Sequence, residues 1–258
     1  MPPGPYARLT NLSPEANGYL IVATKYLNSD YVQYGCGFCA PERWLNFDAS
    51  PTLRWERLPL LGRLYTRNVR RFPRNVRYGD IVRGLPVAAG SCRAIYCSHI
   101  LEHLAFEDFD TALSRTFQYL KAGGVFRLVV PDLEHLARDY VASPDPCASI
   151  RFMEAAHLGR KQRQRSLHGF LTDWLGNSMH QWMWDEKSLA KKLREHGFVN
   201  IRRAQFGDAE DQRFNEVEEC DRFVGCLAMQ CVKEQGSLAT GLSRDQAGTG
   251  GPMALWTA

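Results

Sequence analysis

Short apolar runs alternate with longer amphipathic stretches along most of the chain, and this alternation predicts an α/β fold. Runs rich in β-branched and aromatic residues predict strands over 31–34, 44–47, 75–78, 92–98 and 125–132, and then two closing strands in FVNIRRAQF and RFVGCLAMQCV. The run 125–132 is apolar almost throughout, as expected for a parallel strand that is covered on both faces.

Helical patterns lie before and between these runs. Ser13 as N-cap and Pro14 at the first helical position predict a helix from Pro14 to about Leu27. Further helices are predicted in 106–124, with a stop at Gly123-Gly124, in 133–141 and in 185–198. Repeated strand–helix units predict a three-layer α/β/α sandwich around a mostly parallel sheet.

The pattern divides the chain into three parts. We expect an N-terminal helical extension over 1–30, one α/β domain over 31–232 and a flexible tail over 233–258 that is rich in Gly, Ser and Thr. The alternation lapses in 142–184, which predicts a lid or a substrate-facing insertion. The aromatic stretch WLGNSMHQWMW at its end either lines an acceptor pocket or plugs the core.

Composition narrows the class of protein. The 258 residues are 45% hydrophobic and 23% charged, and no apolar run approaches the ~20 residues that span a membrane. The N-terminus has no secretory h-region, so a cytoplasmic location with eight free thiols is expected. The net charge is +4, and arginines cluster in 62–77 and 159–165. We interpret both clusters as solvated surface, since no nucleic-acid motif accompanies them, and nucleic acid is not an expected partner.

A glycine turn after the first strand is the first candidate site. Gly35 and Gly37 follow the strand, and Asp48 closes the next one, 13 residues after Gly35. A dinucleotide fingerprint needs a full helix after the turn and an acidic residue about 20 residues on. The segment between the strands, which contains Pro41, is too short for that helix, so NAD is disfavoured. The sequence has no P-loop motif either.

Six motifs occur in an order that resembles class I S-adenosylmethionine-dependent methyltransferases: YGCG, LNFDAS, YGDIVRGLPV, IYCSHILEHL, LKAGGVFRLVVPDL and HGFVNIRR. The chain is most similar to a bacterial group with a short first glycine loop, often found with surface-glycan or natural-product genes. The resemblance covers residues 31–232. It implies a Rossmann-like, mostly parallel seven-stranded sheet with an antiparallel last strand, S-adenosyl-L-methionine as cofactor and a small-molecule acceptor.

The resemblance also implies the roles of particular residues. Gly35 and Gly37 would let the backbone approach the cofactor, Asp48 would accept both ribose hydroxyls, and Asp80 with the Ile81 amide would hold the adenine. The complete predicted cofactor set is Tyr34, Gly35, Cys36, Gly37, Asp48, Asp80, Ile81, Ser98 and His99. Two rivals stay open, namely a non-methylating enzyme that uses the same cofactor and a cofactor-binding protein without turnover.

Residues 99–103 read His-Ile-Leu-Glu-His, which is also the H-x-x-E-H pattern of inverted zinc peptidases. That motif needs a long helix, whereas here it directly follows a strand, so a peptidase is disfavoured. Some related methyltransferases place Glu and His here on a divalent metal, and His180, His168 or His157 would complete such a set. We favour a capping role for Glu102 and His103, and no metal is predicted. His103 and His180 are the candidate general bases.

Overall fold

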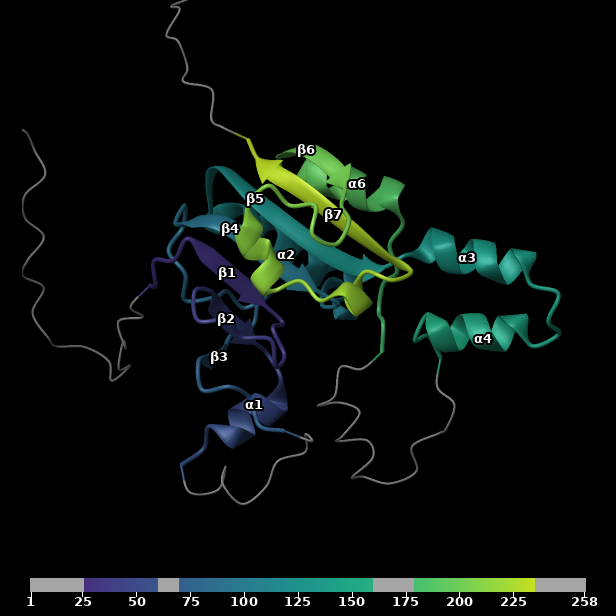
Figure 1. The fold of residues 1–258 in the computed structure, drawn as a ribbon, viewed down its shortest axis with the longest axis horizontal. Helices are drawn as coiled ribbons and strands as arrows, with labels where there is room; N and C mark the ends of the chain where they lie inside the picture. The colour runs from purple at the N-terminus through teal and green to yellow at the C-terminus, as the bar shows by residue number, and fades with distance from the viewer. Residues whose placement is uncertain (1–25, 60–69, 160–178, 235–258) are drawn as a thin grey trace, which may run out of the picture.

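The computed structural model describes residues 26–59, 70–159 and 179–234. Its seven-stranded sheet has the order β3-β2-β1-β4-β5-β7-β6 (Figure 1). Strands β1 to β5 run parallel, and β7 is antiparallel to both β5 and β6. This sheet confirms the predicted fold class. Its strands are β1 (Tyr31–Tyr34), β2 (Leu45–Asp48), β3 (Val76–Tyr78), β4 (Cys92–Ser98), β5 (Leu120–Pro131), β6 (Phe198–Arg203) and β7 (Cys226–Lys233).

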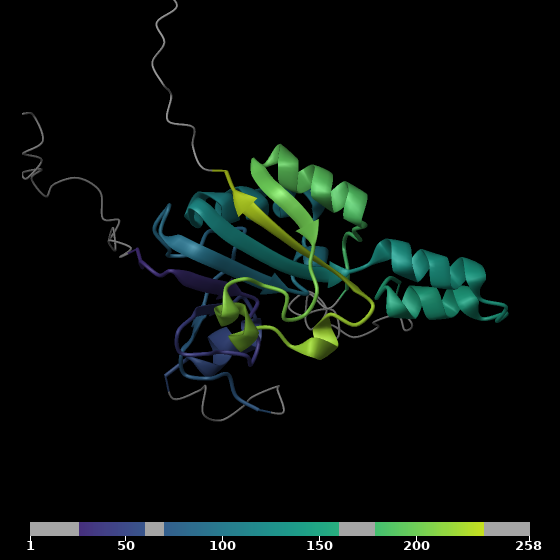
Figure 2. The ribbon, with the colours of Figure 1, turned by 45° about the horizontal axis from the view of Figure 1, so that its top comes forward.

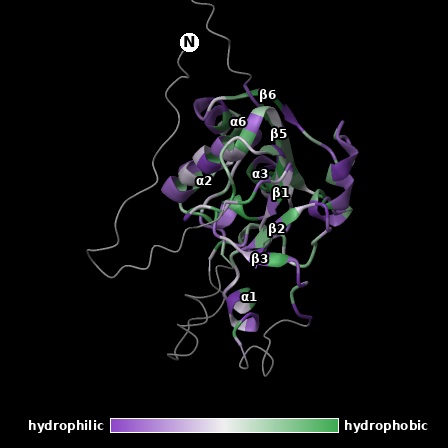
Figure 3. Cartoon of the chain, turned by 90° about the vertical axis from the view of Figure 1, so that its left-hand side faces the viewer, coloured by the Kyte–Doolittle hydropathy of each residue, from purple (hydrophilic) through white to green (hydrophobic). Residues whose placement is uncertain are grey.

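Two amphipathic helices, α2 (Phe106–Tyr119) and α6 (Glu186–Glu195), cover one face of the sheet. Their buried positions recur at helical spacing, and both helices carry hydrophilic as well as hydrophobic residues, as the colours of Figure 3 show. Asp185 caps α6 and accepts a hydrogen bond from the Ser188 amide. Helix α2 ends at Tyr119 instead of Gly123, because Leu120 is already extended and begins β5.

The connection between β1 and β2 contains turns and no helix, as its length predicted. A short helix that the sequence analysis missed, α1 (Pro51–Glu56), follows β2 instead. Ser50 caps it by accepting a hydrogen bond from the Thr52 amide, and Leu53 is fully buried. Right-handed crossovers that run in opposite directions across a sheet place their helices on opposite faces. The absent β1–β2 helix would therefore have covered the face opposite α2.

Residues 204–225, between β6 and β7, cover much of that second face (Figure 2). In the described part of the chain this cover is built from turns and two short 3₁₀ helices, Gln212–Glu216 and Cys220–Arg222. Phe214 packs against Trp44 and Tyr96, with ring centroids 5.6 and 6.4 Å apart. The segment thus supplies the apolar layer that a crossover helix would have given.

A buried arginine of β5 anchors this segment. The Arg127 side chain is 1% exposed, and its Nε donates to Glu218 Oε1 over 2.7 Å. Its Nη1 donates to Asp208 Oδ1 over 2.8 Å, and its Nη2 to the Gln205 carbonyl over 3.1 Å. The second Glu218 oxygen accepts the Gly207 amide. All three partners belong to the covering segment, so the buried charge ties that segment to the sheet.

The predicted insertion 142–184 contains helix α4 (Ala148–Ala155). This helix lies beside α3 (Leu133–Ala142), which was predicted over 133–141, and both project from the sheet in Figures 1 and 2. At the end of the insertion, Trp184 is buried and stacks on Phe109 at 4.1 Å, whereas Trp182 is 44% exposed. Trp184 therefore fills the core, which was one of the two alternatives for this stretch; the other was that it lines an acceptor pocket.

Several predictions fall outside the described residues. They are most of the helix expected over 14–27, residues 160–178 of the insertion, the tail from residue 235 and parts of both arginine clusters. Leu27 is described, and it pairs with Val87 in an isolated parallel bridge instead of ending a helix. None of the helices in the described part is long and apolar enough to cross a membrane.

Replacing Glu218 with alanine leaves the Arg127 guanidinium buried without its main counter-charge. We expect Glu218→Ala to lower the free energy of unfolding by about 3–5 kcal/mol, measured by urea denaturation. The neighbouring Glu219→Ala is the matched control, because Glu219 forms a half-exposed pair with Arg222 and its loss should cost at most about 1 kcal/mol. Equal losses for the two variants would contradict the anchoring role of Arg127.

Candidate functional site

The predicted site residues converge on one edge of the sheet. Gly35, Asp48, Asp80 and Ser98 lie at or just beyond the carboxyl ends of β1, β2, β3 and β4. These four strands are parallel neighbours, with Tyr34 beside Phe47 and Cys97, and Asp48 beside Tyr78. In open α/β sheets, ligands bind at this edge. The topology therefore brings together side chains that the sequence spreads over more than 60 positions.

The turn after β1 is held in a left-handed conformation at both glycines, with φ of 69° at Gly35 and 53° at Gly37. The Gly37 amide donates to Asp48 Oδ2 over 3.0 Å, so the turn is tied to the next strand. A Cβ on Gly37 would meet nothing within 4 Å, which leaves room for a ligand to approach the backbone. A Cβ on Gly35 would lie 2.1 Å from the side chain of Ile100. At Gly35, then, an added side chain would meet the protein itself.

Asp48 is 8% exposed and already accepts two backbone hydrogen bonds. Gly37 donates to one carboxylate oxygen, and the Ser50 amide donates to the other over 2.8 Å. Burial raises the pKa of Asp48 above its usual value, although these two amides act in the opposite direction. Each carboxylate oxygen can accept a second hydrogen bond, so the residue keeps the capacity to bind a pair of hydroxyls.

Asp80 lies beside this group on the turn after β3. Its Oδ1 accepts the Val82 amide over 2.9 Å, and its Oδ2 lies 3.5 Å from Arg83 Nε. The Gly79 amide donates to the Asp48 carbonyl, which joins the two turns. The side chain of Ile81 is buried in the main core cluster, so only its backbone is suited to a ligand.

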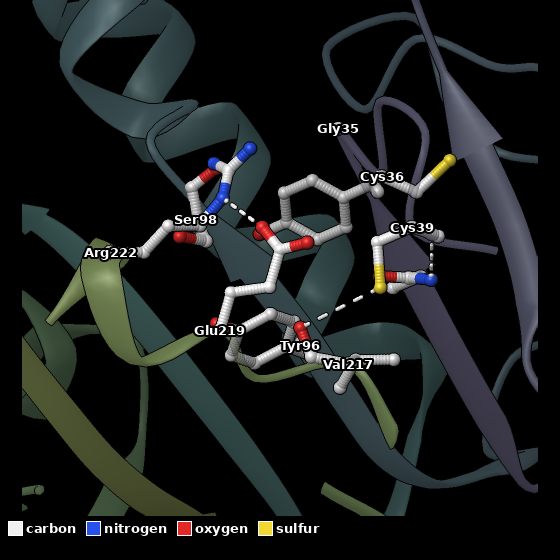
Figure 4. Close-up of a pocket in the computed structure, with 10 residues that line it drawn as sticks. Gly35, Cys36, Cys39, Tyr96, Ser98, Val217, Glu219 and Arg222 are labelled. Atoms are coloured by element: carbon white, nitrogen blue, oxygen red, sulfur yellow. Dashed lines mark hydrogen bonds and ion pairs between the residues drawn. The ribbon is translucent and has the colours of Figure 1, made fainter. Parts of the chain in front are cut away.

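A pocket of about 250 Å³, including its open mouth, lies between the ends of β1 and β4 and the segment 204–225 (Figure 4). Four of the predicted residues line it: Tyr34, Gly35, Cys36 and Ser98. The sequence analysis missed the six others: Gln33, Cys39, Tyr96, Val217, Glu219 and Arg222. The last three belong to the covering segment, and no local motif marks them, because only the tertiary fold brings them to the strand ends.

Charged and sulfur-bearing side chains give the pocket its polarity. Arg222 Nε donates to Glu219 Oε2 over 2.9 Å, and Arg222 Nη1 donates to the Ser98 carbonyl over 3.4 Å (Figure 4). Burial raises the pKa of both the Cys36 and the Cys39 thiols. Both cysteines are therefore protonated at neutral pH, which disfavours thiolate chemistry at the C-x-x-C pair.

Below this edge, three histidines surround the buried carboxylate of Glu102, which lies in the turn Leu101–His103. The Glu102 side chain is 0% exposed, and its Oε1 lies 3.2 Å from His99 Nδ1. The same oxygen lies 4.0 Å from His103 Nε2 and 4.0 Å from His180 Nε2. The two histidines predicted as general bases thus meet, with ring centroids 4.9 Å apart, although 77 positions separate them in the sequence.

His99 is not a lining residue of the pocket described above. Its Nε2 contacts the Arg222 carbonyl at 3.1 Å, and its backbone is left-handed with φ of 55°. Burial opposes protonation, but the contacts with Cys226 and Glu102 outweigh it and raise the pKa of His99 to about 10. Burial lowers the pKa of His180, which is therefore neutral at pH 7. His157 packs against His180, and His168 lies outside the described residues.

A family comparison places the chain in a known family. Residues 23–203, more than half of the chain, match the model of a methyltransferase domain family. The chain belongs to this family, and its mostly parallel seven-stranded sheet with an antiparallel last strand is the one that the resemblance to class I methyltransferases implied. No curated protein has a matching sequence.

Many solved structures are similar in fold. A putative S-adenosylmethionine-dependent methyltransferase from Listeria monocytogenes is 17% identical with a TM-score of 0.43, over 80% of this chain and 92% of that one. A possible histamine N-methyltransferase from Thermotoga maritima is 14% identical with a TM-score of 0.42, over 81% and 84%. A Haemonchus contortus phosphoethanolamine N-methyltransferase is 10% identical with a TM-score of 0.40, over 81% and 50%. At these values the similarities say nothing about the substrate.

The two glycines of the turn should respond differently to alanine. Gly37→Ala is expected to cost about 1–2 kcal/mol of stability from the left-handed backbone alone. Gly35→Ala should cost more, because its Cβ also meets Ile100, and an added Ile100→Ala substitution should recover part of the excess. Urea denaturation of the single and double variants measures this coupling. Additive effects of Gly35→Ala and Ile100→Ala would show that the two residues do not share this space.

Proposed function

We propose that the protein is an S-adenosylmethionine-dependent methyltransferase that acts on a small molecule or on a glycan or natural-product intermediate. The observation that carries this proposal is the convergence of the glycine turn, Asp48, Asp80 and Ser98 on one sheet edge in a chain of a methyltransferase family. These residues come from four different strands, and they supply the backbone access, carboxylates and hydroxyl that a nucleoside with an amino-acid tail requires.

The residues fit this cofactor in three respects. Gly37 faces open space, so a ligand can approach its backbone. Asp48 has two carboxylate oxygens with remaining acceptor capacity for the ribose hydroxyls. Asp80 lies on the adjoining turn and would accept a hydrogen bond from the adenine amino group. Tyr34, Cys36, Ser98 and the Ile81 amide would complete the proposed cofactor site, and His99, the residue after Ser98, would support its methionine end.

The cofactor supplies a methyl group on a sulfonium that is already a good leaving group. The protein then has to orient the acceptor in line with that methyl group and, where needed, remove its proton. His103 and His180 are the residues proposed to remove a proton from the acceptor. Both lie next to the buried carboxylate of Glu102, close to the end of β4.

The cofactor assignment makes a prediction about Asp80. Asp80→Ala should weaken the binding of S-adenosylmethionine and of S-adenosylhomocysteine by about 1–3 kcal/mol, or roughly 5- to 150-fold in Kd, the cost of losing a partner in a buried polar contact. Isothermal titration calorimetry measures both affinities. Asp139→Ala, at an exposed position on α3, is the control and should bind as the wild type does. Unchanged affinity in Asp80→Ala would remove Asp80 from the site.

The reaction type is tested by product analysis. The purified protein is incubated with S-adenosylmethionine and a panel of small-molecule and glycan acceptors, and the nucleoside products are identified by mass spectrometry. We expect S-adenosylhomocysteine together with an acceptor that is heavier by one methylene. Methylthioadenosine would instead support the rival enzyme that uses another part of the cofactor. Tight binding without any product would support a cofactor-binding protein without turnover.

A further inference from the structure

The carboxylate of Glu102 is fully buried without a matching set of hydrogen bonds. Oε1 has one close neighbour, His99 Nδ1 at 3.2 Å, and Oε2 accepts no hydrogen bond from any residue that the structure describes. Burying an ionised carboxylate costs several kcal/mol unless cations or donors surround it. A carboxylate that remains half satisfied at the edge of a candidate active site therefore points to a group that binds there.

The orientation of the His103 ring also indicates a group that binds beside Glu102. Its Nδ1 lies 3.1 Å from the Met179 carbonyl, and a carbonyl oxygen can only accept, so Nδ1 carries the hydrogen. In the neutral ring the lone pair is then on Nε2, the atom that lies 4.0 Å from Glu102 Oε1. The Nε2 atom of His180 lies at the same distance from that oxygen. Two imidazole nitrogens and one carboxylate oxygen, all within 4.8 Å of one another, thus converge on one point.

We propose that Glu102, His103 and His180 bind one divalent transition-metal cation. Two imidazoles and one carboxylate are a donor set that suits Zn²⁺, Fe²⁺ or Co²⁺, whereas Mg²⁺ and Ca²⁺ prefer oxygen ligands and water. Metal bonds of about 2.0–2.2 Å place the ligand atoms of a tetrahedral site roughly 3.3–3.6 Å apart. The two histidine nitrogens lie 4.0 Å from Glu102 Oε1, and all three ligand atoms lie within 4.8 Å of one another. Binding a metal therefore requires these atoms to approach by up to about 1.5 Å, which side-chain rotation can provide.

Two of the three proposed ligands, His103 and Glu102, have outer partners, whereas His180 Nδ1 has no hydrogen-bond partner among the described residues. The Met179 carbonyl orients His103, and His99 contacts the Glu102 carboxylate, as outer partners do in metal sites. The backbone amides of Gln181 and Trp182 donate to the Glu102 carbonyl over 2.7 and 3.1 Å. These bonds fix the turn of Glu102 against the stretch that carries His180, so two segments distant in sequence present one preorganised group.

An ion cluster without a metal is the competing explanation. In that explanation, the contact between His99 Nδ1 and Glu102 Oε1 at 3.2 Å accounts for Oε1. It does not account for Oε2, nor for two further imidazole nitrogens directed at the same carboxylate. His99, which also contacts the Arg222 carbonyl, is therefore a positioning residue in this proposal, and it connects the cation site to the wall of the pocket.

The consequence for the reaction rests on the proposed function, whereas the cation site itself does not. Three protein ligands leave positions open on the cation, and these can take oxygen atoms of the acceptor. A bound cation would lower the pKa of an acceptor hydroxyl and hold it next to the end of β4, so His103 and His180 would then act as metal ligands instead of general bases. The acceptor class that fits is one with neighbouring hydroxyl or carboxylate oxygens, such as a sugar or a hydroxy acid.

The site is tested by titrating the chelator-treated full-length protein with Co²⁺, without cofactor or acceptor, and recording visible absorption and calorimetry. We expect one Co²⁺ per chain with visible bands of nitrogen and oxygen ligation. Glu102→Gln, His103→Ala and His180→Ala should each abolish this site. His99→Asn, which tolerates the left-handed backbone, should weaken binding about 10- to 100-fold. His135→Ala on α3 is the control and should bind as the wild type does.

Three outcomes would overturn the proposal. One is the lack of saturable Co²⁺ binding by the wild type. Another is binding that persists in both histidine variants. The third is thiolate-to-cobalt absorption, which would assign the ion to the free cysteines. Circular dichroism checks that each variant is folded. If one is not, the change in Tm on adding Zn²⁺ is measured for the wild type and for the ligand variants that do fold. The proposal requires that Zn²⁺ raise the Tm of the wild type and not of those variants. Because S-adenosylmethionine is omitted, failure here leaves the proposed methyl transfer untouched, and failure of the transfer leaves this site untouched.

Discussion

The buried guanidinium of Arg127 is the interaction on which the second face of this fold depends. The connection between β1 and β2 is too short to contain a helix, so one face of the sheet lacks the cover that a crossover helix gives. Residues 204–225 replace that cover with turns and two short 3₁₀ helices, which pack Phe214 and Val217 onto the sheet but contain no long helix to hold their backbone in place. Arg127 compensates by contacting Glu218, Asp208 and the Gln205 carbonyl at once, so a single buried side chain holds three points of the segment.

The same segment forms one wall of the pocket. Glu218 points to the sheet and contacts Arg127, while Val217, Glu219 and Arg222 line the pocket. Glu218, which binds Arg127, is thus the chain neighbour of the pocket residues Val217 and Glu219. The position of this side of the pocket therefore depends on the buried ion pair. This arrangement places polar and charged groups above the strand ends, where a longer β1–β2 connection would otherwise have placed a helix.

The site has two ends that are built in different ways. The proposed cofactor end consists of turns directly after strands, and the Gly37 amide and the Ser50 amide already organise Asp48. The proposed acceptor end is assembled over long distances, since Glu102 and His103 follow β4 whereas His180 comes from the end of the insertion.

The sequence by itself determined the strands, the main helices, the fold class and the residues at the strand ends, because these follow from local periodicity and from turn chemistry. It also predicted that no helix separates β1 from β2. It missed α1, which is one and a half turns long, and it missed the pocket residues of 204–225, which have no periodic pattern. Only the tertiary structure decided that Trp184, and not Trp182, fills the core, and that Ile100 occupies the space beside Gly35. It likewise decided that His180 meets Glu102 and His103, because contacts between distant segments depend on how the layers pack and not on any local preference of the chain.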